Sequence, residues 1–385
     1  LNNSFNPVHP GSLAHLDPPP LIFSILGDLI AAGLNNNLLA YELSPGVTLL
    51  EESLCKWFAR KIGFNDSSGG IAASGGTLSN LNALIAARNN AGLGSDPNCL
   101  LIVSEDAHSS FIKCTRIMGL DPKNLVMIKT DNNGCMDIQN LKKTLDDCLI
   151  ENKKIFAIVA TLGTTVRGAI DPIKDISDLC KEKNIWLHID GSIGGVFAIT
   201  SIPIEGLNNI NQANSITINP QKIIGITKTS SLLLVSDMST LQNTFSTGLP
   251  YISSKENVIN RGEMGIQGSR PAEIIKLWLG LRFLGLKGIE EILESSIKRK
   301  DFFIKNICKN KYEICSGPLH IVSFIPKRLP PEDLDLWTKN KVNELMKKNF
   351  MLSRPKFKGN YYLRVVMGNY NTNESHIEEL LEFLD

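Results

Sequence analysis

The sequence has almost no net charge and no basic patch. Its 385 residues contain 40 Lys and Arg against 39 Asp and Glu, which gives a formal net charge of +1. Nucleic-acid binding needs a basic stripe or patch, and the short basic run at 298–300 is followed at once by an acidic residue. We interpret that run as a solvated helix face and expect no nucleic-acid partner.

Long apolar segments and paired cysteines are also missing. No run approaches the roughly 20 residues of a membrane-spanning helix, and no charged and apolar regions of a secretory signal open the chain. The eight cysteines are scattered without a CxxC pair, which fits reduced thiols better than disulfides or zinc ligands. The sequence thus predicts a cytoplasmic globular protein with no membrane partner and no metal.

Four common catalytic signatures are absent as well. The sequence contains no GxGxxG after a strand, no GxxxxGK[ST], no HExxH and no GxSxG. These absences argue against a dinucleotide fingerprint, a P-loop, a zinc-protease helix and a nucleophile elbow. Any chemistry must therefore be carried by other residues.

From residue 48 onward, helical patterns alternate with short apolar runs. Thr48 is placed to cap a helix over 49–62 that ends at Gly63. The apolar runs show little alternation, as is typical of strands covered on both faces. This pattern predicts an α/β fold with a doubly wound, mostly parallel sheet. We expect helices at 78–90, 109–118, 137–150 and 172–183, and strands at 99–103, 125–128, 155–161, 185–189, 215–218 and 231–235.

The two ends of the chain differ from this central region. The first 45 residues are rich in Asn and Pro around one apolar helix at 21–34, and they predict an arm that packs on a neighbouring domain or subunit. Toward the C-terminus we expect helices at 272–284, 289–308, 334–348 and 375–383, and strands at 321–324 and 361–366. The predicted parts are an arm (1–45), a large α/β domain (46–290) and a small α+β C-terminal domain (291–385).

Two segments near predicted strand ends carry residues suited to binding. In the turn 74–80, glycines let backbone N–H groups approach an anion, and Thr77 can cap the following helix while donating to a phosphate oxygen. His108 follows a strand, where open α/β sheets bind ligands, and its imidazole can stack on a ring or transfer a proton. The alternatives are an ordinary strand-to-helix turn and a loop histidine without function.

Two further strand ends carry an acid and an amine. Asp190 ends an apolar strand, where its carboxylate can pair with a protonated ring nitrogen or simply cap the next loop. Lys222 follows an apolar strand that ends in Asn219 and Pro220. A partly buried lysine has the lowered pKa that Schiff-base formation needs, whereas a surface lysine does not. An anion cradle, a ring partner, an acid and a lysine together are what pyridoxal phosphate (PLP) requires.

These segments resemble the group II PLP-dependent amino-acid decarboxylases, which include the glutamate, aromatic amino-acid, cysteine-sulfinate and diaminobutyrate decarboxylases. The resemblance implies a fold-type-I PLP-dependent transferase-like fold, a homodimer, and decarboxylation of a small L-amino acid to the amine and carbon dioxide. It extends from about His9 to the end of the chain. The matching stretches are 44–51 (SPGVTLLE), 74–80 (SGGTLSN), 107–110 (AHSS), 160–165 (ATLGTT), 188–190 (HID), 219–222 (NPQK), 266–270 (IQGSR), 276–278 (KLW) and 363–366 (LRVV).

Residue by residue, the resemblance implies a cofactor site. Lys222 would hold PLP as a Schiff base, and Asp190 would keep its pyridine nitrogen protonated, with His108 stacked on the ring. Thr165 would contact the 3-oxygen region, and Thr48 would approach the substrate, often across a dimer interface. The full expected set of cofactor-binding residues is Gly76, Thr77, His108, Thr165, Asp190, Ser192, Asn219, Gln221 and Lys222.

The sequence departs from the family pattern at three points. Gln221 stands where the family usually has His, and Gly191-Ser192 stand where it usually has Ala-Ala or Ala-Tyr. The segment 252–261 contains no Tyr, although the family's loop in this region carries one that protonates the substrate carbon. An aldehyde-forming decarboxylating deaminase and a catalytically silent PLP-fold protein therefore stand as alternatives. The presence of Lys222 together with Asp190 argues against the silent protein.

Overall fold

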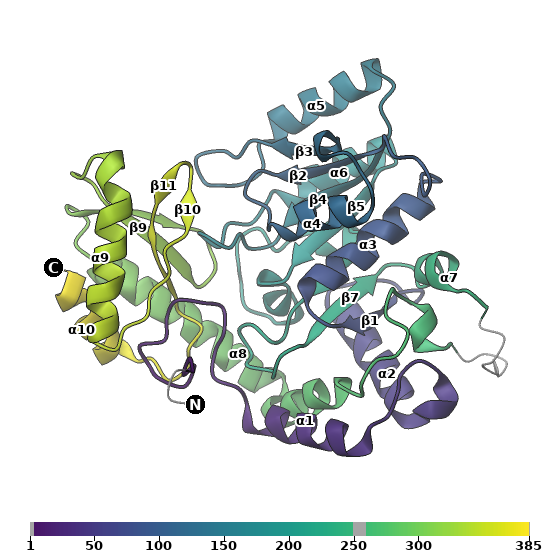
Figure 1. Ribbon diagram of the computed structural model, residues 1–385, viewed down its shortest axis with the longest axis horizontal. Helices are drawn as coiled ribbons and strands as arrows, with labels where there is room; N and C mark the ends of the chain where they lie inside the picture. The colour runs from purple at the N-terminus through teal and green to yellow at the C-terminus, as the bar shows by residue number, and fades with distance from the viewer. Residues whose placement is uncertain (1–3, 249–258, 385) are drawn as a thin grey trace.

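The computed structural model describes residues 4–248 and 259–384, and its largest element is a seven-stranded sheet (Figure 1). The strand order is β1-β7-β6-β5-β4-β2-β3. The pairs β3–β2, β2–β4, β4–β5 and β5–β6 are parallel, whereas β7 is antiparallel to both of its neighbours. The predicted α/β fold with a mostly parallel sheet is therefore confirmed. The strands are β1 Gly69–Ala73, β2 Leu100–Ser104, β3 Leu125–Ile128, β4 Ile155–Thr161, β5 Trp186–Gly191, β6 Ser215–Ile218 and β7 Ser231–Val235.

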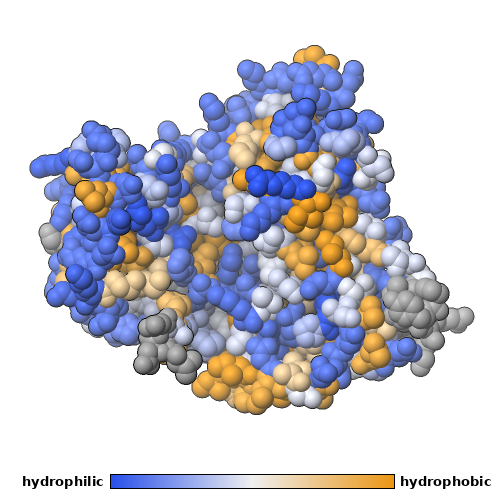
Figure 2. Space-filling view, in the orientation of Figure 1, coloured by the Kyte–Doolittle hydropathy of each residue, from blue (hydrophilic) through white to orange (hydrophobic). Residues whose placement is uncertain are grey.

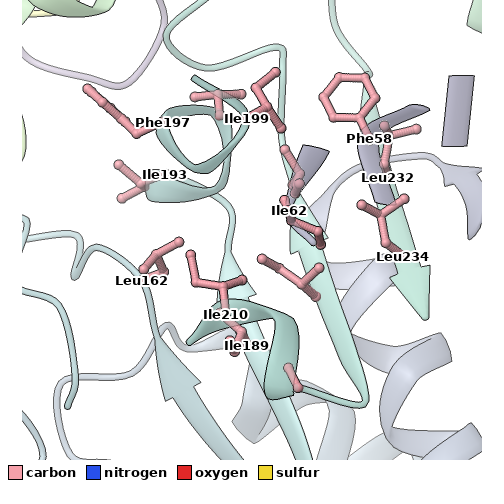
Figure 3. Packing of buried hydrophobic residues seen from close by; sticks show 14 of the residues in the cluster. Phe58, Ile62, Leu162, Ile189, Ile193, Phe197, Ile199, Ile210, Leu232 and Leu234 are labelled. Atoms are coloured by element: carbon pink, nitrogen blue, oxygen red, sulfur yellow. The ribbon is translucent and has the colours of Figure 1, made fainter. Parts of the chain in front are cut away.

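The central strands are apolar because helices cover both faces of the sheet (Figure 1). In β4, Ala157 and Val159 join a core with α3 and α4, while Ile158 and Ala160 join the main core on the other face. Figure 3 shows part of the main core, in which Phe58 lies with side chains of the strands and the following loops. The covering helices are α2 Pro45–Lys61, α3 Gly76–Asn90, α4 Ser110–Ile117, α5 Ile138–Ile150, α6 Ile173–Lys183 and α7 Ser239–Phe245.

Two elements near the start of the sheet differ from the prediction. Helix α2 begins at Pro45, so Thr48 lies inside its first turn and is not the cap that we expected. Proline fits the first helical position because its missing N–H has no helical partner there. Strand β1 was missed because it is short and rich in glycine, yet Gly70 is needed there, since a Cβ at this position would lie 2.2 Å from the Leu233 carbonyl oxygen.

A second, three-stranded antiparallel sheet has the order β12-β9-β8 and its own core. The long helix α8 (Ile274–Asn306) connects it to the large sheet (Figure 1). We expected two helices here, and the backbone of α8 is indeed interrupted at Gly285, where φ is 62°. The remaining elements are β8 Tyr312–Ser316, β9 Ile321–Pro326, α9 Leu334–Lys347, β10 Lys356–Phe357, β11 Asn360–Tyr361, β12 Leu363–Val366 and α10 Glu374–Leu384.

The N-terminal segment joins both sheets. Leu13 donates to Met351 (3.0 Å) and accepts from Val366 (2.8 Å) through the backbone, and α1 (Ile22–Leu34) packs along α8 (Figure 1). The close approach of these helices requires Gly27, because a Cβ there would lie 2.4 Å from the Lys276 Cα. None of the helices in the described ranges has both the length and the apolar composition for crossing a bilayer.

Candidate functional site

A cavity of about 270 Å³ lies at the carboxyl ends of the central strands. Such strand ends are where open α/β sheets bind ligands. The cavity brings together nine of the ten residues predicted to form the site; the exception is Thr48. The nine are Gly76, Thr77, His108, Thr165, Asp190, Ser192, Asn219, Gln221 and Lys222.

One end of the cavity is a cradle of hydrogen-bond donors at the N-terminus of α3. Gly75 precedes the helix with φ 99°, a backbone conformation that glycine adopts at no steric cost. A Cβ on Gly76 would lie 2.7 Å from Asn219 Nδ2 and 2.8 Å from Ser192 Oγ, so only glycine leaves this space open. Asn219 Oδ1 accepts from Ser231 Oγ (2.6 Å), which directs the amide nitrogen of Asn219 toward the cradle. A helix N-terminus with these donors is suited to bind an anion such as a phosphate.

Asp190 forms the floor of the cavity as a buried carboxylate. It sits near the end of β5, in register with Thr161 of β4 and Thr217 of β6. Its Oδ1 accepts from the Ser192 N–H (3.1 Å) and its Oδ2 from Asn80 Nδ2 (3.2 Å). Burial alone raises the pKa of the Asp190 carboxyl, but Lys222 and the Ser192 N–H outweigh burial and lower it. Asp190 is therefore ionised at neutral pH.

Lys222 faces Asp190 across the same cavity. Its backbone N–H donates to the Asn219 carbonyl (3.1 Å), so the turn after β6 fixes its position. Burial lowers the pKa of the Lys222 amine, and the carboxylates of Asp190 and Asp17 only partly offset this effect. A lysine with a lowered pKa is more readily neutral, and a neutral amine is the nucleophile that attacks a carbonyl.

Three of the remaining predicted residues line the cavity walls. His108 Nδ1 accepts from the Ser110 N–H (3.1 Å), which leaves Nε2 as the protonated nitrogen of a neutral ring. Gln221 Oε1 accepts from the Ser230 N–H (2.6 Å). The Thr165 carbonyl accepts from Arg364, a side chain of the small sheet. The cavity walls are thus fixed by contacts from both sheets.

Thr48 lies apart from this cavity. Thr48 is 2% exposed in the first turn of α2, and its Oγ1 has no hydrogen-bond partner among the described residues. Its expected approach to the substrate across an interface stays a prediction. Of the segment 252–261, residues 252–258 lie outside the described residues.

Seven of the sixteen residues that line the cavity were not predicted as site residues, among them Thr161 and Asn80. Thr161 ends a predicted strand, and this position is a signal that could have identified it. In the structure it lies in register with Asp190. Asn80 was part of the matched turn, but its bond to Asp190 joins residues 110 positions apart, and no local pattern reveals that contact. Within the residues that the structure describes, no group of three or more His, Cys, Asp or Glu side chains could hold a metal ion.

Comparisons with known proteins agree with this geometry. The family described as "Pyridoxal-dependent decarboxylase conserved domain" matches residues 9–325. The chain is 30% identical to an aromatic-L-amino-acid decarboxylase of Bacillus atrophaeus, over 99% of this chain and 82% of that protein. It is 31% identical to the acidic amino acid decarboxylase GADL1 of Xenopus tropicalis, over 73% of this chain and 59% of that protein.

Solved structures show the same fold. The structure of mouse CSAD is similar with a TM-score of 0.92 at 25% identity, covering 99% of this chain and 84% of that one. The structure of Oryza sativa TDC with PLP and tryptamine has a TM-score of 0.92 at 22% identity, again over 99% of this chain and 84% of that one. The architecture described above is thus shared with proteins of this kind.

Proposed function

The chain belongs to the family of pyridoxal-dependent decarboxylases, and we propose that the substrate of its PLP-dependent decarboxylation is a small L-amino acid, which is converted to the corresponding amine and carbon dioxide. The observation that carries this proposal is the pairing of buried, ionised Asp190 with low-pKa Lys222 in one cavity beside an anion cradle. Neither a purely structural sheet edge nor a simple phosphate site needs all three features.

Different residues of the cavity suit different parts of the PLP molecule. The space kept open by Gly76 between Ser192 and Asn219 suits the phosphate, because donors surround it on several sides. Thr161 lines the cavity, and its Oγ1 atom is buried with no hydrogen-bond partner among the described residues, so a bound group can supply the hydrogen bond that it lacks. When bound, PLP supplies an electron-poor ring that accepts the electrons released from the amino-acid carbon as the carboxylate leaves.

We assign each cavity residue a role on this basis. Lys222 provides the neutral amine that holds the aldehyde of the cofactor. Asp190 stays ionised and stabilises the proton on the pyridine nitrogen, which keeps the ring electron-poor. His108 would lie against the ring face, and Thr165 would lie near the 3-oxygen. Five cavity residues would hold the phosphate: Gly76, Thr77, Ser192, Asn219 and Gln221.

A panel of amino acids tests the proposed reaction. We expect purified protein with added PLP to release carbon dioxide and an equal amount of amine from at least one L-amino acid and not from its D-enantiomer. The panel includes aromatic, acidic and diamino acids, because the relatives that match act on aromatic and acidic amino acids by name. Gas release and amine are quantified from the same reaction. Aldehyde and hydrogen peroxide in place of amine would overturn the proposed product.

We further propose that the protein is a homodimer formed through α1. This helix buries its small residues (Ser24, Gly27 and Ala31) against the rest of the chain and exposes its large apolar ones. Exposed apolar patches of this kind mark interaction sites. In Figure 2 they form a hydrophobic patch at the lower edge, where α1 lies in Figure 1. The exposed side chains are Ile22, Phe23, Ile25, Leu26, Leu29, Ile30 and Leu34.

Sedimentation tests the dimer. Ile22 and Leu29 are 72% and 69% exposed, and replacing both by Lys should convert a dimer at micromolar concentration into a monomer because two charges would enter an apolar interface. Leu336 on α9 is 62% exposed, and Leu336→Lys is the matched control that should stay dimeric. A wild-type protein that sediments as a fully active monomer would contradict the proposal.

We also infer a division into an arm (1–45), a PLP-binding domain (46–290) and a small domain (291–385), which limited proteolysis can test. The seven-stranded and the three-stranded sheet support it, as does the core that the three-stranded sheet forms with α9 and α10. A cytoplasmic location, which cell fractionation can test, is supported by the eight cysteines, all of which are free thiols.

A further inference from the structure

A chain of five buried side chains runs through the large sheet and ends on Asp190. Trp186 Nε1 lies 2.8 Å from Ser215 Oγ, and Ser215 Oγ lies 2.8 Å from His188 Nδ1. His188 Nε2 then lies 3.1 Å from Asn80 Oδ1, and Asn80 Nδ2 lies 3.2 Å from Asp190 Oδ2. All five side chains are at most 6% exposed. The contacts connect β6, β5 and α3 beneath the cavity.

The direction of these hydrogen bonds follows from the tryptophan end. An indole N–H can only donate, so Ser215 Oγ accepts from Trp186. The buried Ser215 hydroxyl must then place its own hydrogen elsewhere, and the other partner within the described part of the chain is His188 Nδ1. His188 Nδ1 is therefore an acceptor. Burial holds the pKa of this imidazole well below its usual range, so the ring is neutral and its one proton is on Nε2.

The same direction follows independently from the carboxylate end. An ionised carboxylate can only accept, so the Asn80 amide must turn its NH₂ group toward Asp190. The second amide hydrogen reaches Ser110 Oγ at 3.3 Å. Asn80 Oδ1 then faces His188 and needs a donor, which the Nε2–H supplies. The two ends require the same direction of hydrogen bonds, and every polar side-chain group among the five residues then has a partner.

We propose that His188 and Asn80 are positioning residues that orient the Asp190 carboxylate and keep it ionised for the cofactor, a role that rests on the proposed function. His188 and Asp190 are two positions apart on β5 and so project to the same face of the sheet, where Asn80 of α3 bridges them. Four N–H or O–H donors point in one direction along the chain, and their dipoles all stabilise the negative charge at its end. Ser215 and Trp186 fix the tautomer of His188.

The tautomer of His188 tests the inference without any turnover. In apoprotein with ¹⁵N-labelled histidine, we expect His188 to be a neutral Nε2–H tautomer that does not titrate between about pH 6 and 8. His188→Gln identifies its signals by their loss. An Nδ1–H tautomer or a charged ring at His188 would overturn the inference, even if the protein proves to be an active decarboxylase. Conversely, the expected tautomer in a protein that lacks decarboxylase activity would locate the failure in the proposed function.

Variants of the chain test its effect on the bound cofactor. Ser215→Ala and His188→Leu should lower kcat by up to about tenfold with little change in KM, because each loses a hydrogen bond between neutral groups whose effect reaches Asp190 through Asn80. Both should also shift the pH titration of the absorbance of bound PLP. His188→Gln should recover most of the loss, because its side-chain N–H can replace Nε2–H toward Asn80. Ser177→Ala is the matched control, since Ser177 Oγ in α6 is buried and has no hydrogen-bond partner in the part of the chain that the structure describes.

One outcome of these variants would contradict the proposed positioning role. If His188→Leu does not fold, Ser215→Ala still removes the donor to Nδ1 with the loss of a single oxygen. Equal behaviour of Ser215→Ala and Ser177→Ala in kcat and in the absorbance titration would show that the chain is structural only, and would overturn its role toward Asp190.

Discussion

Asp190→Ala is expected to lower kcat by at least about 10²-fold while the fold and part of the PLP binding remain. Removing one preorganised electrostatic group from a water-excluded active site costs about 10²–10³-fold in kcat. In this site Asp190 holds its charge in spite of burial, because Lys222 and the Ser192 N–H favour the ionised form. Without the carboxylate, the pyridine nitrogen loses the partner of its proton, and the ring no longer accepts electrons well.

The measurement is steady-state turnover together with the absorbance of bound PLP and a thermal-unfolding scan. Asp106→Asn is the matched control, because Asp106 also follows a strand end and accepts from Thr130 Oγ (3.3 Å), yet it does not line the cavity. The control should retain activity within a few-fold of wild type. Equal activity of Asp190→Ala and wild type would show that Asp190 only stabilises the structure.

Lys222→Ala is expected to abolish repeated turnover. No other lysine lines the cavity in the described part of the chain, so the variant loses the amine that holds the aldehyde. The phosphate cradle is untouched, and we therefore expect PLP to bind more weakly and to be removed by dialysis. Turnover, the absorbance spectrum and the cofactor retained after dialysis check this result.

Lys228→Ala is the control for this prediction. Lys228 is close in sequence, but its side chain is 53% exposed and pairs with Asp17 at the surface. It should keep both activity and cofactor. If Lys222→Ala still turns over many equivalents of substrate, the assignment of the cofactor lysine is wrong.

The fold could be predicted where sequence patterns reflect local physics. Strands β2 and β4 to β7 are continuous apolar runs because they are covered on both faces. Each of the strands β2 to β7 was expected within two residues of its observed position. Strand β1 has the sequence GGIAA, whose glycines weaken any strand pattern. Its position depends on close contact with β7 and on the buried guanidinium groups of Arg261 and Arg270, which donate to its carbonyl oxygens. Those contacts come from distant parts of the chain.

The candidate site likewise contains residues that the sequence could locate and contacts that it could not. Lys222 and Asp190 could be located because each follows or ends an apolar strand, and parallel strand ends meet at one edge of the sheet. The glycine turn could be located from its own residues, because glycines and Thr77 before a helix suit an anion. The hydrogen bonds from His188 through Asn80 to Asp190 could not be predicted from the sequence, because they depend on how α3 packs against β5. Thr48 was placed as a helix cap because Pro45, three residues earlier, was not recognised as the start of α2.

The central claim is that Lys222 alone holds PLP in this chain. Borohydride reduction of the protein with bound PLP, followed by digestion and mass spectrometry, tests it most directly, because reduction fixes the cofactor on the lysine that carries it. The account predicts one modified peptide, which contains Lys222, and no such peptide from Lys222→Ala. A modification on Lys228, or on any other lysine in place of Lys222, would contradict it.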